Sequence, residues 1–160
     1  MIKTARNRTK DTQFNLIVPN AKIKTHNDAL LMCAEKAAEH LNISQERVLK
    51  RINEREDMNN SAIGNGVAIP NVKMRRVQKP FTMLMTLDQD ITYDTPDNTP
   101  LNMYAFLISP TSDGPIHLRR LSRLSRLLLQ DSLRQRIRET KDEEIIQSLL
   151  MDPEGWLIAA

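Results

Sequence analysis

The 160-residue chain lacks several features that mark particular classes of protein. No apolar run approaches the roughly 20 residues that a membrane-spanning helix requires, and no signal-peptide core follows the N-terminus. We therefore expect a cytoplasmic protein without membrane insertion. Cys33 is the one cysteine, which excludes an internal disulfide, and its apolar neighbours predict a small buried side chain.

Aromatic residues make up only 4% of the chain, and this scarcity bears on nucleic-acid binding. The net charge of +3 is smaller than the charge of the four cations in the first ten residues, so the rest is near neutral. Arg119, Arg123 and Arg126 have the spacing of a basic strip on a helix, but no aromatic stacking motif accompanies them. We expect a solvated or protein-docking face there and no nucleic-acid partner.

The chain length suits one domain, for which we expect residues 21–150, with a flexible basic leader at 1–20 and a tail at 151–160. The N-terminal half predicts a short strand at 21–24, followed by a helix that is capped by Asn27 and Asp28 and ends near Leu41. Ser44 predicts the cap of a second helix that runs from Gln45 to about Arg55. A polar, glycine-bearing loop at 57–70 then ends in a short strand at 67–69.

The C-terminal half begins with apolar runs of strand length at 81–87 and 103–108, with turn residues between them that predict a hairpin or meander. A long helix is expected from Ile116 or His117, and two shorter helices follow at 132–139 and 142–150. The expected apolar stripe of the long helix consists of Leu118, Leu121, Leu124 and Leu128, with Leu127 as a further candidate. Helices, then strands, then helices predict an α/β fold: a three-layer-like sandwich with one mixed sheet flanked by helices.

Two segments of the sequence carry a family resemblance. The segment from Glu54 to Pro70 contains Glu54-Arg55-Glu56 and ends in Gly64-Asn65-Gly66-Val67-Ala68-Ile69-Pro70. It resembles the active-site segment of enzyme IIA proteins of the bacterial phosphotransferase system, in the nitrogen-regulatory branch of the mannitol/fructose type. A second motif, from His117 to Leu128, follows in the order that this family has. The resemblance covers roughly residues 20 to 150 and implies the enzyme IIA mannitol/fructose-type fold.

The resemblance also implies what the residue after Ile69-Pro70 does. In the family this residue is the histidine that carries a phosphoryl group, whereas this chain has Asn71. An amide nitrogen is not nucleophilic, because its lone pair is delocalised into the carbonyl, but the amide can reproduce some hydrogen bonds of a neutral imidazole. Asn71 can be an engineered substitution or natural divergence. The family pattern is also altered at Asn59, Asn60, Ala62 and Val72, which favours divergence.

The resemblance assigns roles to several other residues. Arg55 falls at the arginine that lies beside the phosphate, and a guanidinium suits this role because its donors form a fixed fork. His117 falls at the family's second histidine, which lies at the start of a long helix and helps to position the phosphorylated histidine. Ser61 aligns with the family's threonine in the phosphate-binding loop, and Gly64 and Gly66 are expected to supply positive φ angles there.

The remaining acidic residues and histidines of these regions match no catalytic position. Glu54 and Glu56 are expected to be surface or loop-ordering groups, and His26 and His40 are expected on the surface. No residue is assigned to a metal or to a cofactor.

These features favour a degenerate nitrogen-regulatory-type enzyme IIA that acts as a regulatory protein-binding module. The family implies an HPr-like phosphocarrier and a regulated transporter or kinase as partners, bound through the face around Asn71, Arg55 and His117. The alternative is an active phosphoryl carrier in a phosphoenolpyruvate-dependent relay, either because Asn71 is an engineered change or because His117 is the acceptor.

Overall fold

The two long apolar runs become the central strands of a six-stranded sheet in the computed structural model, which describes residues 14–151. β5 (Phe81–Ile91) and β6 (Leu101–Pro110) pair antiparallel, as the predicted hairpin requires. β1 (Leu16–Ala21) adds to β5 in parallel, whereas β3 (Val67–Ala68) and β4 (Asn71–Met74) both add to β6 in parallel. The short β2 (Ala62–Gly64) pairs antiparallel with β3, and the sheet is therefore mixed.

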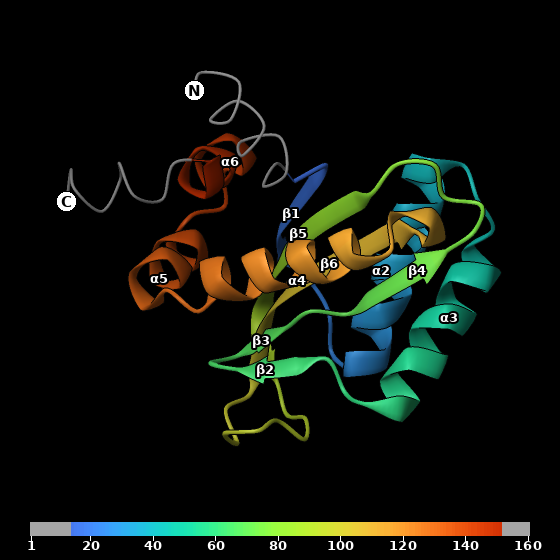
Figure 1. The fold of residues 1–160 in the computed structure, drawn as a ribbon. Helices are drawn as coiled ribbons and strands as arrows, with labels where there is room; N and C mark the ends of the chain where they lie inside the picture. Colours follow the sequence, from blue (N-terminus) through green and yellow to red (C-terminus); the bar gives the residue numbers. More distant parts are fainter. Residues whose placement is uncertain (1–13, 152–160) are drawn as a thin grey trace.

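Helices cover both faces of this sheet (Figure 1). On one side lie α2 (His26–Leu41) and α3 (Gln45–Met58). On the other side lie α4 (Pro115–Leu128), α5 (Asp131–Glu139) and α6 (Glu143–Met151), and a short 3-10 turn at Thr111–Asp113 precedes α4. This arrangement confirms the predicted α/β sandwich.

Strand β6 divides the core into two layers because successive side chains of a strand point to opposite faces. Tyr104 and Phe106 pack into the cluster that contains the apolar residues of α2 and α3. Met103 and Leu107 pack into the cluster that contains the apolar residues of α4, α5 and α6. All four side chains have no exposed surface, so the near-continuous apolar sequence of β6 serves both layers at once.

Two predicted boundaries at the N-terminal end of the domain are wrong. The first strand lies at Leu16–Ala21 and not at 21–24, so the sheet begins within the segment assigned to the leader. Proline is tolerated at position 19 because β1 is an edge strand, and an edge strand has no neighbour on its outer side that needs a backbone N–H donor. Helix α2 is capped by Thr25, whose hydroxyl accepts the Asp28 N–H at 3.1 Å, and not by Asn27 or Asp28. Residues 1–13 and 152–160 of the predicted leader and tail lie outside the described residues.

Other local predictions are confirmed. Ser44 caps α3 by accepting the Arg47 N–H at 3.3 Å, although the helix continues to Met58. Cys33 is fully buried in α2, and this burial raises the pKa of its thiol far above the usual range. Between residues 14 and 151, every helix is too short or too polar to span a bilayer.

Replacing Leu107 by alanine tests the two-layer core. This substitution removes a fully buried side chain from the layer beneath α4, and we expect the free energy of unfolding to fall by about 2–5 kcal/mol. Denaturant unfolding measures the loss. As a control, exposed Asp88 of β5 can be replaced by alanine, for which we expect a change within about 0.5 kcal/mol. Equal effects of the two substitutions would contradict the assigned packing.

Candidate functional site

An interruption in the sheet places Asn71. β3 ends at Ala68 and β4 begins at Asn71, and both strands pair with β6. Ile69 and Pro70 therefore interrupt what would otherwise be one continuous strand beside β6. The break is held on both sides, because the Ile69 N–H donates to Ser61 O at 2.8 Å and the Leu107 N–H donates to Pro70 O at 3.1 Å. Asn71 therefore emerges at a fixed point beside the central strand.

Helix α4 delivers His117 to the same point. His117, Leu124 and Leu128 follow the i, i+7, i+11 spacing of one helix face, and all three are buried, with His117 only 4% exposed. The prediction that Leu118 belongs to the buried stripe is wrong, since this side chain is 63% exposed. Successive residues of a helix are about 100° apart, so the face that buries His117 turns Leu118 toward the solvent.

A continuous chain of hydrogen bonds joins Asn71 to His117 and to the residues behind it. The Asn71 Nδ2 donates to Ile69 O at 2.9 Å, which leaves Asn71 Oδ1 to accept from His117 Nε2 at 3.1 Å. His117 Nε2 therefore carries the proton, and Nδ1 accepts from the Ser109 hydroxyl at 2.8 Å. Arg120 in turn donates to Ser109 Oγ at 3.1 Å. Because Asn71 Oδ1 can only accept, this chain fixes the tautomer of His117 with its proton on Nε2.

The surroundings of His117 favour its neutral form. Burial of the ring and the positive charges of Lys73, Arg120 and Arg55 lower its pKa from 6.5 to about 4, although the carboxylate of Asp113 opposes the shift. At neutral pH the imidazole is therefore uncharged. This state agrees with the hydrogen-bond chain, in which Nδ1 must accept.

Two cations beside Asn71 have no acidic partner. A cavity of about 430 Å³ is lined by Asn71 and His117 together with Arg55 of α3 and Lys73 of β4. Neither Arg55 nor Lys73 forms an ion pair with any described residue. In contrast, Arg51 at the same cavity pairs with Glu54 at 3.0 Å, and Arg120 pairs with Asp113 at 2.6 Å. The positive charge of the cavity therefore comes from Arg55 and Lys73.

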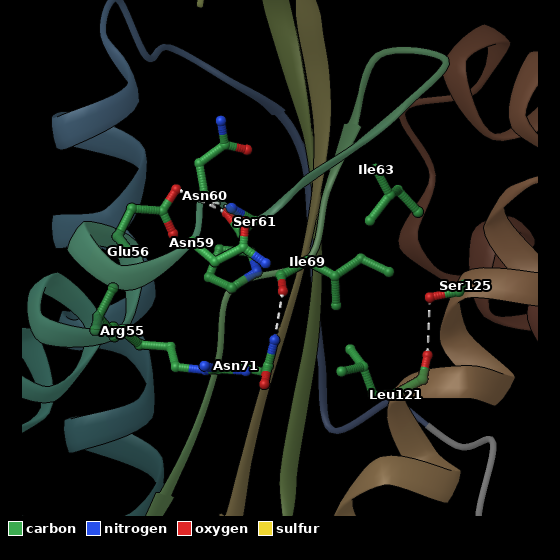
Figure 2. Close-up of a pocket in the computed structure, with 12 residues that line it drawn as sticks. Arg55, Glu56, Asn59, Asn60, Ser61, Ile63, Ile69, Asn71, Leu121 and Ser125 are labelled. Atoms are coloured by element: carbon green, nitrogen blue, oxygen red, sulfur yellow. Dashed lines mark hydrogen bonds between the residues drawn. The ribbon is translucent and has the colours of Figure 1, made fainter. Parts of the chain in front are cut away.

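A smaller cavity of about 170 Å³ adjoins the first, and Arg55 and Asn71 line both (Figure 2). Figure 2 shows the Arg55 side chain extending from α3 toward Asn71 and Ser61 lying above them. The Ser61 N–H and hydroxyl both donate to Glu56 Oε1, at 3.1 and 3.0 Å. Glu56 is thus a loop-ordering group, as predicted, and its carboxylate accepts the hydrogen bond of the Ser61 hydroxyl.

His26 is buried, and its predicted surface location is wrong. Its side chain is 6% exposed, and the two ring nitrogens contact Tyr104 Oη at 2.7 Å and Glu56 Oε1 at 2.8 Å. The ring also stacks on Tyr93, with centroids 3.8 Å apart. Burial raises the pKa of Glu56, but the hydrogen bonds from His26 and Ser61 outweigh it and hold this pKa below its usual range. The predicted surface location of His40 is confirmed.

The glycines of the motif shape a turn and line neither cavity. Gly64 and Gly66 have φ angles of 99° and 81°, which confirms the predicted positive values. Gly64 ends β2, and Gly66 lies in the turn that leads to β3. A side chain at Gly66 would place its Cβ 3.0 Å from Asn102 Oδ1, so this position excludes larger residues. The residues that line the two cavities include Ser61 but neither glycine.

Four residues of the site were not predicted from sequence: Ser109, Lys73, Asp113 and Arg120. Ser109 is the one polar residue near the end of an otherwise apolar run, and this exception was the available signal. Lys73 and Asp113 gave no signal, because a charged residue near a strand end or turn is ordinary. Within residues 14–151 no group of three or more His, Cys, Asp or Glu side chains has the geometry of a metal site.

The protonation of His117 can be measured directly. In an NMR pH titration we expect its imidazole resonances to titrate near pH 4, with assignment by their loss in His117→Gln. The unfolded chain binds this proton at a higher pH than the folded chain does. The contribution of His117 to stability is therefore present above pH 6.5 and is lost as the pH falls toward 4. A midpoint near 6.5 in the folded protein would contradict the buried, neutral assignment.

Glu56 and Glu54 offer a matched pair of substitutions in α3. Glu56→Ala removes the acceptor shared by His26 and Ser61, and we expect a loss of about 1–3 kcal/mol in unfolding free energy and faster amide exchange at Ser61. Glu54→Ala removes only an exposed pair with Arg51, for which we expect a loss below about 1 kcal/mol. Unchanged exchange at Ser61 in Glu56→Ala would show that the loop is ordered by other contacts.

Comparison with known proteins agrees with this geometry. Residues 12–152 match the family model described as "Phosphoenolpyruvate-dependent sugar phosphotransferase system, EIIA 2". The nitrogen regulatory protein of Bradyrhizobium diazoefficiens is 32% identical over 137 residues, which cover 86% of this chain and 90% of that protein. The nitrogen regulatory protein of Escherichia coli is 30% identical over 128 residues, which cover 79% of this chain and 78% of that protein.

Solved structures show the same fold. The nitrogen regulatory protein IIA-Ntr from Neisseria meningitidis superposes with a TM-score of 0.78 at 19% identity, over 88% of this chain and 94% of that one. IIA mannitol from Escherichia coli superposes with a TM-score of 0.71 at 17% identity, over 84% and 94% of the two chains. The chain therefore belongs to the EIIA 2 family of the phosphoenolpyruvate-dependent sugar phosphotransferase system and is a nitrogen-regulatory-type enzyme IIA.

Proposed function

We propose that this chain is a regulatory protein-binding module that does not carry a phosphoryl group at the usual position of its family. The observation that carries the proposal is Asn71, which stands after Ile69-Pro70 where the family has its phosphorylated histidine. A phosphoryl carrier needs a nucleophile, and the amide has none. Both polar atoms of Asn71 are also engaged, by Ile69 and His117, which supports a surface held in one unphosphorylated-like state.

The hydrogen bonds of His117 argue against this residue as a substitute acceptor. Its Nε2 carries a proton that points to Asn71, and its Nδ1 lone pair accepts the Ser109 hydroxyl. A nucleophilic imidazole must direct a free lone pair at the phosphorus atom. Phosphorylation of His117 would therefore require both hydrogen bonds to break and the buried ring to move.

The partners of this chain follow from its family and from its surface. We propose that an HPr-like phosphocarrier and a regulated transporter or kinase bind through the face around Asn71, Arg55 and His117. A structural neighbour, IIA mannitol from Escherichia coli, is known in a complex with phosphorylated IIB mannitol, and it superposes with a TM-score of 0.70 at 16% identity. Exposed Met58 and Leu118 at the cavity of this chain give a partner protein apolar surface to cover.

A reconstituted relay tests the proposal. The chain is incubated with phosphoenolpyruvate, enzyme I and HPr, and intact-mass spectrometry measures the gain of a phosphoryl group. We expect no gain for the unaltered chain or for Asn71→Gln, which preserves an amide. Phosphorylation of the unaltered chain at any histidine would overturn the proposal.

The variant Asn71→His completes this experiment. A phosphoryl gain in this variant would show that the lost nucleophile alone prevents transfer and that HPr still docks. If the variant stays unphosphorylated while it still binds HPr, the cavity has been remodelled for binding. Both results agree with a binding module, and they differ in which part of the site has changed.

A further inference from the structure

The unpaired cations beside Asn71 determine the electrostatic character of the larger cavity. Arg55 and Lys73 line the cavity of about 430 Å³ without an acidic partner among the described residues, and both lower the pKa of His117. The other two arginines near the site, Arg51 and Arg120, are already neutralised by Glu54 and Asp113. The electrostatic potential of the cavity is therefore positive near Arg55 and Lys73. Asn71 cannot carry a phosphoryl group, so it supplies no negative charge to these two cations.

We propose that this cavity binds the phosphohistidine of a phosphorylated partner protein without accepting its phosphoryl group, so that the chain recognises the phosphorylated form of that partner. The inference rests on the proposed function, since a chain that took the phosphoryl group would not retain the complex. A guanidinium and an ammonium are the groups that proteins use for phosphoryl oxygens, because both donate charge-assisted hydrogen bonds. Arg55 approaches from α3 and Lys73 from β4, so they can hold one anion between them.

The rim of the cavity favours a phosphoryl group carried by a protein over a free anion. Met58 is 78% exposed and Leu118 is 63% exposed, and both side chains line this cavity. Ile116, which precedes His117 at the start of α4, is 45% exposed. Large apolar side chains around a charged centre gain little from a small hydrated ion, but a partner protein removes them from water.

The arrangement also explains why the complex would not proceed to transfer. Asn71 Nδ2 is bonded to Ile69 O, and its lone pair is delocalised, so no nitrogen at this position attacks phosphorus. His117 stays neutral and shares its Nε2 proton with Asn71 Oδ1. The phosphoryl group therefore meets positive charge and hydrogen-bond donors but no nucleophile, which is the condition for binding without reaction.

Binding measurements with HPr test this inference. Isothermal titration calorimetry compares HPr with phosphorylated HPr, which enzyme I and phosphoenolpyruvate keep phosphorylated, and inorganic phosphate is titrated separately. We expect the phosphorylated form to bind about tenfold or more tightly than the unphosphorylated form, since two charge-assisted contacts are added. This preference should shrink at high salt, because the added contacts are partly exposed.

Four variants of exposed side chains identify the source of the preference. We expect Arg55→Gln and Lys73→Gln each to reduce the preference for phosphorylated HPr severalfold. Arg51→Gln is the matched control, because Arg51 lines the same cavity but is paired with Glu54, and we expect it to keep the preference. Leu118→Asp should weaken the binding of both forms, since it places a charge in the apolar rim.

The possible results separate this inference from the proposed function. Equal affinity for the two forms of HPr, with no mass gain on the chain, would overturn the inference and leave the binding module intact. Inorganic phosphate that binds as tightly as phosphorylated HPr would identify the ligand as a small anion and would also overturn it. A phosphoryl group found covalently on the chain would overturn both proposals.

Discussion

The hydrogen bond between His117 Nε2 and Asn71 Oδ1 is the contact on which the geometry of the site depends. It joins the start of α4, which covers one face of the sheet, to the start of β4 within the sheet. Its direction is fixed at one end by Ile69 O, which accepts from the side-chain Nδ2 of Asn71, and at the other by the Ser109 hydroxyl, which donates to His117 Nδ1. Because every donor meets an acceptor, the imidazole is neutral and the amide cannot rotate without leaving a half-buried polar group unsatisfied.

The cations around this hydrogen bond differ in whether they have an acidic partner. Arg51 and Arg120 each have a carboxylate, whereas Arg55 and Lys73 have none among the described residues. The unpaired charges lie toward the cavity and act on His117, whose pKa they lower together with burial. A site with these walls and an amide at its centre is suited to hold an anion and unsuited to form a bond with it.

Much of the fold and the centre of the site could be predicted from the sequence. Helix and strand periodicity predicts the core elements, and the two motifs predict that Arg55, Asn71 and His117 meet in one site, as they do. The failures have different physical causes, and for His26 the deciding partner is distant in sequence. His26 is buried because Tyr104 lies 78 residues away and accepts or donates at its ring, and no local pattern reveals such a contact. Leu118 is exposed because His117 takes its place on the buried face of α4.

The central claim is that this site binds a phosphoryl group and does not receive it. Phosphorus-31 NMR of phosphorylated HPr mixed with the unaltered chain tests it most directly, because one spectrum reports both contact and transfer. The predicted result is a phosphohistidine resonance that shifts or broadens when the chain is added and keeps its intensity as HPr phosphohistidine. A new phosphohistidine resonance that belongs to this chain, or a spectrum unchanged by its addition, would contradict the claim.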